Sequence, residues 1–191
     1  QVTLTALAGG QKESTGAHVR CLPGDVFFRN HDFTSLFTVV SGDLNNFSKG
    51  MKSAVIGQKL AEILEIGPKD TFKLITTKTG AKGVLTPKLT SFKVAAVVSS
   101  GYQELDALWV FVPIDTAYSY IPLNTADFSL MIETEDAFSP SLSKVRANVE
   151  SVTGRHAHVY TWNEMNASEF ENFSSTKVML VFIMMLIVLV A

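Results

Sequence analysis

Residues 71–99 read TFKLITTKTGAKGVLTPKLTSFKVAAVVS and contain the pattern that decides the fold. Apolar and polar residues alternate over 71–75, where Phe72 and Leu74 flank Lys73, and residues 92–98 form a continuous β-prone run. These patterns predict two strands that pair across a connection at 76–91. The connection is sixteen residues long. It therefore exceeds an ordinary hairpin loop, and loops of that length are commonly functional or disordered.

The predicted connection is also basic. No acidic residue occurs from Thr71 to Gln103, although the whole chain has a net charge of -2. One interpretation is a solvated, mobile hairpin. The other is a protruding docking element whose lysines steer an acidic partner and whose apolar residues are stiffened by proline. The sequence leaves both interpretations open, and the candidate docking residues are Lys78, Gly80, Lys82, Val84, Leu85, Pro87 and Lys88.

Short β-prone runs continue on both sides of this region. Further strands are predicted at 1–6, 17–21, 26–28, 36–40, 53–56, 108–114, 128–133 and 155–161. Helical periodicity predicts helices at 58–65, 116–121 and 139–154, and a last helix that starts near Asn163 or Asn166. Strands interspersed with a few helices predict an α+β fold.

The end of the chain is far more apolar than the rest. The mean hydropathy of +0.22 is high for a soluble domain, and residues 178–191 (VMLVFIMMLIVLVA) contain no polar side chain. Fourteen helical residues rise about 21 Å, whereas the hydrocarbon core of a bilayer is about 30 Å thick. The run is interpreted as the first part of a transmembrane helix that the chain end cuts off. The alternative is a buried terminal helix or strand.

Composition and motifs exclude several classes of protein. An apolar content of 47% excludes a disordered chain, the single Cys21 excludes a disulfide scaffold, and a pI of 6.1 argues against a nucleic-acid binder. The chain has no G-x-x-x-x-G-K-[ST] nucleotide cradle and no G-x-S-x-G or H-E-x-x-H motif. His156 and His158 lack a third metal ligand on the same predicted strand. An acidic cluster is more simply a solvated turn than a catalytic pair: Glu133, Glu135 and Asp136. No catalytic, cofactor or metal site is therefore expected.

An ordered series of short motifs resembles a known family. The first motif is VIGQKLA at 55–61 followed by Leu64 and Asp70, and the second is FKVAAVVSSG at 92–101 followed by Glu104 and Asp106. Residues 110–114 with Asp115 and Ala117 come next, and the series ends with Trp162, Phe170, Phe173, Lys177 and Met179 before the apolar tail. This order resembles the extracytoplasmic domain of LolC/LolE-type permeases. These are the membrane subunits of the lipoprotein-releasing ABC transporter, in the MacB/FtsX-like permease superfamily.

The resemblance implies a periplasmic domain of two parts on the bacterial inner membrane. A Porter-like part would comprise 1–34 and 122–177, a β-rich Sabre-like part 35–121, and the start of the second transmembrane helix 178–191. In LolC a hairpin loop called the Hook recruits the lipoprotein carrier LolA, and 76–87 is the matching segment here. The implied partners are a separate cytoplasmic ATPase subunit, a partner permease subunit, a LolA-like carrier and lipoprotein substrates, with no cofactor and no nucleic acid.

Two alternatives remain from the sequence. One is a MacB-like mechanotransmission domain that serves efflux or secretion, within the same superfamily. The other is a membrane-anchored extracytoplasmic binding domain that belongs to no transporter. On each of these hypotheses the chain itself is not an enzyme.

Overall fold

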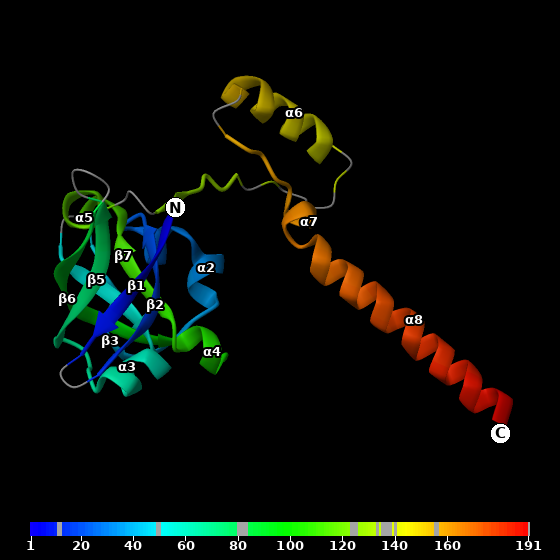
Figure 1. Ribbon diagram of the computed structural model, residues 1–191, viewed down its shortest axis with the longest axis horizontal. Helices are drawn as coiled ribbons and strands as arrows, with labels where there is room; N and C mark the ends of the chain where they lie inside the picture. The colour runs from blue at the N-terminus through cyan, green and yellow to red at the C-terminus, as the bar shows by residue number, and fades with distance from the viewer. Residues whose placement is uncertain are drawn as a thin grey trace. The chain divides into compact units, whose positions relative to one another are not determined.

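The computed structural model describes residues 1–10, 13–48, 51–79, 84–122, 126–132, 134, 139, 141–154 and 157–190. It divides into two compact units, Gln1–Met131 and Ile132–Ala191. The first unit is a β-rich body with short helices, and the second is helical (Figure 1). The predicted mixture of strands and helices with an apolar C-terminal helix is confirmed.

Six strands of the first unit close into a ring. In order around it, β1 pairs with β2, then come β7, β4, β6 and β5, and β5 pairs back with β1. The β2–β7 and β4–β6 pairs are parallel and the others antiparallel. Their bounds are β1 Val2–Gly9, β2 Ser14–Leu22, β4 Ser53–Gly57, β5 Thr71–Thr79, β6 Leu85–Ser99 and β7 Trp109–Pro113. Two short strands flank the ring: β3 Thr38–Gly42 on β6, and β8 Asp127–Phe128 on β1.

The interior of this barrel is filled by every second side chain of its strands. Along β1 every second residue from Val2 to Ala8 is buried, because successive side chains of a strand point to opposite faces. Strands β4 and β7 are apolar almost throughout because both of their faces are covered. The helices α3 Gln58–Leu64 and α5 Ile114–Tyr120 lie at opposite ends of the barrel (Figure 1), and Leu60, Leu64 and Ala117 join its core.

A second apolar cluster covers part of the barrel's outer surface. The short helices α1 Val26–Arg29 and α2 His31–Ser35 and the 3₁₀ turn η1 Leu44–Asn46 bring aromatic rings against β7. Phe27 meets Phe47 edge-on at 5.0 Å between ring centroids and Phe111 at 6.1 Å. These edge-to-face contacts are the arrangement that ring quadrupoles favour.

At the turn after β6, the motif at 55–61 contacts the motif at 92–101 and the Asp106 that follows it. The carboxylate of Asp106, in α4 Gln103–Asp106, accepts hydrogen bonds from Ser99 Oγ at 2.8 Å, Ser100 N at 2.8 Å and Ser100 Oγ at 2.7 Å. Gly57 lies so close that a Cβ there would overlap the Asp106 carbonyl group. Gly57 and Asp106 therefore form the contact between β4 and α4.

The second unit contains α6 Leu142–Thr153, α7 Trp162–Met165 and α8 Ala167–Val190. Thr161 and Glu164 form a capping box at the start of α7, in which each side chain bonds the other residue's backbone N–H. Arg146 of α6 pairs with Glu164 and also, at 2.8 Å, with Glu150. The pairing holds α6 against α7.

Three local predictions are wrong. Residues 26–28 form a helical turn and no strand, because the turn packs Phe27 into the outer aromatic cluster. Residues 157–161 of the strand predicted at 155–161 lie in no regular element. Among the described residues of the strand predicted at 128–133, only Phe128 is in a strand, at the end of β8, where it pairs with Val2.

The division into a Porter-like and a Sabre-like part, which the resemblance implies, stays a prediction. Strands β1 and β2, from the first 34 residues, share one hydrogen-bonded ring with strands from 35–121. The two compact units separate between Met131 and Ile132.

Candidate functional site: the β5–β6 ribbon

The predicted pairing of the two strands in 71–99 is confirmed, but the long loop between them is wrong. The antiparallel ladder runs from Thr71 opposite Lys93 to Thr79 opposite Leu85. Most of the segment predicted as a loop is therefore strand. Gly80 and Lys82 lie outside the described residues, whereas the other five candidates lie within them.

The outer part of this hairpin leaves the barrel as a two-stranded ribbon. β1 pairs with β5 only at Leu7–Gly9, and β4 pairs with β6 only from Lys93 onward. Beyond those pairs, 76–79 and 85–88 have each other as their only strand partners within the described residues. We call these eight residues the ribbon.

Threonine side chains fasten the ribbon. Thr76 Oγ1 donates to the Lys88 carbonyl at 3.4 Å, and Thr86 Oγ1 donates to the Lys78 carbonyl at 3.2 Å. At the base, Thr90 Oγ1 donates to the Tyr120 carbonyl of α5 at 3.2 Å. An isolated two-stranded hairpin is marginally stable, so these cross-strand bonds supply stability that no third strand provides.

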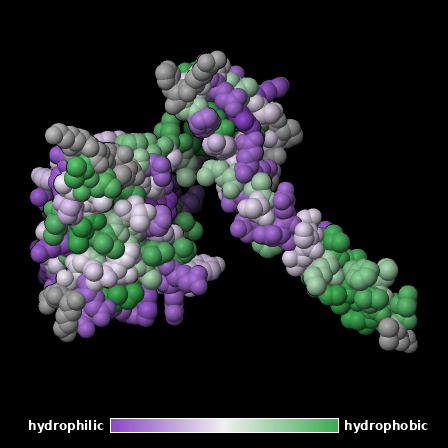
Figure 2. Space-filling model, in the orientation of Figure 1, coloured by the Kyte–Doolittle hydropathy of each residue, from purple (hydrophilic) through white to green (hydrophobic). Residues whose placement is uncertain are grey.

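The two faces of the ribbon differ in chemistry. Leu85 and Pro87 of the ribbon and Leu89 just beyond it alternate along β6 and share one face, on which Leu85 is 62% and Leu89 58% exposed. The opposite face carries Lys78 and Lys88 at diagonal positions of the ladder. Neither lysine forms an ion pair with any residue that the structure describes. Figure 2 shows apolar areas on the surface of the first unit over β5 and β6.

The free edges of the ribbon are protected against unwanted pairing. Pro87 has no N–H to offer to another strand, and the lysines make close approach of a second copy unfavourable. Exposed leucines here are therefore compatible with a surface that binds a selected partner. The apolar face continues onto the barrel. Ile75 lies opposite Leu89 in the β5–β6 ladder, and Leu7 lies opposite Ile75 in the β1–β5 ladder.

The sequence interpretation missed this face for a clear reason. Because 76–91 was predicted to be a loop, the alternation of Leu85, Pro87 and Leu89 was not used to infer that their side chains share one face. That period of two is the signal that could have found it.

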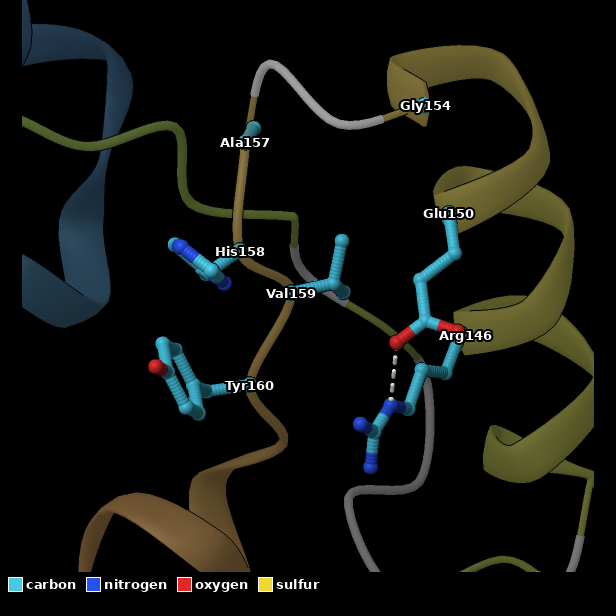
Figure 3. Close-up of a pocket in the computed structure, with 7 residues that line it drawn as sticks. All are labelled: Arg146, Glu150, Gly154, Ala157, His158, Val159 and Tyr160. Atoms are coloured by element: carbon cyan, nitrogen blue, oxygen red, sulfur yellow. Dashed lines mark hydrogen bonds and ion pairs between the residues drawn. The ribbon is translucent and has the colours of Figure 1, made fainter.

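A depression in the second unit offers less chemistry. It has a volume of about 570 Å³, and Arg146, Glu150, His158, Val159 and Tyr160 contribute to its lining. In Figure 3 Val159 points toward Arg146 and Glu150, whereas His158 and Tyr160 extend on the other side of the chain. The hydrogen bond to Glu150 and its negative charge raise the pKa of Arg146 above its ordinary value. Two carboxylates, Glu150 and Glu164, bond to this guanidinium and more than balance its charge, so the site does not attract an anionic ligand.

Other reactive groups have structural roles. Cys21 is fully buried in the barrel, and burial raises its thiol pKa to about 12, so the thiol stays protonated and unreactive. Among the described residues no group of three or more His, Cys, Asp or Glu side chains is placed to hold a metal. His156 and the acidic cluster Glu133, Glu135 and Asp136 lie outside the described residues.

Helix α8 is long and apolar enough to cross a membrane. Within Ala167–Leu189, an 18-residue window has a mean hydropathy of 1.9, and none of that window is buried. The helix therefore qualifies as a membrane anchor by length and composition.

Comparisons with known proteins found distant similarities in structure only. No family model and no curated protein sequence matches the chain. The extracellular domain of the noncanonical ABC-type transporter YknZ from Gram-positive bacteria aligns with a TM-score of 0.49 and 14% identity, over 81% of this chain and 76% of that one. A domain assigned to a permease from Porphyromonas gingivalis aligns with a TM-score of 0.38 and 12% identity, over 80% and 63%. At these values neither neighbour carries a functional conclusion.

Proposed function

We propose that this chain is the extracytoplasmic domain of an ABC-transporter permease subunit of the lipoprotein-releasing type, and that the ribbon docks a periplasmic carrier protein. The ordered motifs at 55–61 and 92–101 and the apolar helix α8 support the permease assignment. On this proposal the domain lies in the periplasm, and α8 enters the bacterial inner membrane. ATP hydrolysis belongs to a separate cytoplasmic subunit, and a partner permease subunit completes the transporter.

The observation that carries the docking role is the separation of charge and apolar surface on the ribbon. Lys78 and Lys88 attract an acidic partner from the opposite face and raise its association rate, because unpaired surface charges act at long range. Leu85 and Leu89 then supply apolar area that becomes buried in the complex. Loss of both leucines is expected to cost about 2 kcal/mol, or roughly 30-fold in Kd.

A carrier-binding measurement tests the proposal with matched charge variants. The wild-type chain is immobilised, and a LolA-like carrier is passed over it at low and at physiological salt. The Lys78→Glu/Lys88→Glu variant is expected to weaken binding about tenfold or more, with the larger effect at low salt. The control is Lys73→Glu/Lys93→Glu, which makes the same charge change on the same two strands. Lys73 is about 17 Å from Lys78 along the strand.

The outcomes separate the candidate functions. Binding that is lost in the ribbon variant and kept in the control supports carrier docking. Equal loss in both variants means that only net charge matters and contradicts a localised site. No carrier binding by the wild type contradicts the proposal and favours a MacB-like mechanotransmission domain or a membrane-anchored binding domain.

A further inference from the structure

Helix α8 has two halves of different character. Residues 167–177 are mostly polar, and the apolar run begins at Val178. Two aromatic residues interrupt the polar half: Phe170 is 42% and Phe173 71% exposed. At 100° per residue they lie about 60° apart around the helix, so they share one side of it.

A tryptophan joins this aromatic side. Trp162 of α7 meets Phe170 edge-to-face, with 5.4 Å between ring centroids and 78° between planes, and it is itself 54% exposed. The capping box of Thr161 and Glu164, with the Arg146 ion pair to Glu164, fixes the turn that presents it. Trp162, Phe170 and Phe173 therefore form a preorganised aromatic group at the base of the apolar run.

Phe173 lies near the expected level of the membrane interface, and Phe170, which contacts Trp162, lies farther out along the helix. With a rise of 1.5 Å per residue, Phe173 lies about 7.5 Å and Phe170 about 12 Å above Val178 along the helix axis. The polar layer of one leaflet is roughly 5–7 Å thick, and a tilted helix brings a lateral group closer to it. Amphipathic rings, tryptophan above all, accumulate at this level because one part is apolar and another is polar.

The charged residues of this half lie mainly beside the aromatic group. Glu169 and Glu171 point about 100° around the helix from Phe170 in opposite directions, which puts Glu169 about 40° from Phe173. Lys177 lies between Phe173 and the apolar run, where a long cationic side chain reaches headgroup phosphates. Large exposed aromatic side chains in a row are costly in water, and a bilayer surface continuous with the apolar helix is the nearest apolar phase.

We propose that Trp162, Phe170 and Phe173 dock on the lipid headgroup layer and fix the height and rotation of α8 in the membrane. This inference rests on the part of the proposed function in which α8 enters a bilayer. It adds that the partner of the aromatic group is lipid and not a protein surface.

Depth-dependent fluorescence quenching tests the inference. The 191-residue chain is reconstituted into phosphatidylcholine nanodiscs, and Trp109→Phe leaves Trp162 as the only tryptophan. We expect Trp162 emission to shift to shorter wavelength relative to detergent-free buffer. We also expect stronger quenching by a nitroxide at the headgroup than by one at the end of the acyl chain. Trp162→Phe, which leaves only Trp109 of the barrel, is the matched control and should show neither effect.

Each outcome decides a different point. If the chain co-migrates with nanodiscs but Trp162 is not quenched, the aromatic docking is refuted while the membrane helix stands. If the chain does not co-migrate, the membrane anchor of the proposed function fails. A blue shift that is already complete without lipid means that protein covers Trp162, which also refutes the inference. Should Trp109→Phe fail to fold, the difference between wild type and Trp162→Phe reports the same quenching.

Discussion

Replacing Gly57 by alanine is expected to destabilise the barrel by about 3 kcal/mol or more. A Cβ at this position would overlap the Asp106 carbonyl oxygen and come within 2.7 Å of the Asp106 Cα. These are backbone atoms, so the clash is not relieved by a side-chain rotation, and either β4 or α4 must move.

The magnitude has two sources. Inserting a methyl group into a closely packed contact typically costs about 1–3 kcal/mol. A shift of α4 also strains the three hydrogen bonds that the Asp106 carboxylate accepts from Ser99 and Ser100, and bonds to a charged group are worth about 1.5–3 kcal/mol. For a unit of this size the loss corresponds to a decrease in Tm of roughly 10 °C.

The assay is denaturant unfolding followed by Trp109 fluorescence in a Trp162→Phe background, so that the signal reports the barrel alone. The control is Gly16→Ala in β2, since Gly16 has no heavy atom within 4 Å of an added Cβ. That variant is expected to be neutral or slightly stabilising, by up to about 1 kcal/mol. Equal stabilities of the two alanine variants, within about 0.5 kcal/mol, would refute the close-approach argument.

Two further predictions concern buried groups of the barrel. Asp106→Asn keeps the shape of the side chain but removes its charge and places an N–H₂ group among donors, so the free energy of unfolding should fall by about 2 kcal/mol. An unchanged denaturation midpoint would show that the carboxylate is not required. Cys21, with a thiol pKa of about 12, should resist a thiol-specific reagent at about pH 8 in the folded chain and react fully after unfolding. Rapid labelling of the native chain would contradict its burial.

Periodicity correctly predicted the elements whose burial in the fold matches their local sequence pattern. Strand β4 and helix α3 appear as expected because an apolar run is followed by one buried helical face with Leu60 and Leu64. The same approach was wrong for 76–91, where many threonines and lysines surround the alternating Leu85, Pro87 and Leu89. Their strand conformation depends on the ladder with the opposite arm, which lies up to eighteen residues away in the sequence, as for Lys73 and Ser91.

Closure of the barrel was also not predictable from the sequence. The parallel pairing of β2 with β7 joins His18 to Trp109 and Cys21 to Val112, and no local pattern indicates which distant strand is chosen. For the candidate site, the positions of Lys78, Leu85, Pro87 and Lys88 were identified from charge and composition. The direction of their side chains became clear only from the register.

The position of β1 in the ring has a mechanical consequence. One edge of β1 is bonded to β2 along its whole length, from Val2 opposite Cys21 to Gly9 opposite Ser14, while β8 and β5 hold the two ends of its other edge. Because the hydrogen bonds of a ladder are perpendicular to the strand, a pull along β1 loads them in shear and together, and does not open them one after another. Tension applied to this first strand would therefore be transmitted to the whole barrel before any single strand separates from it.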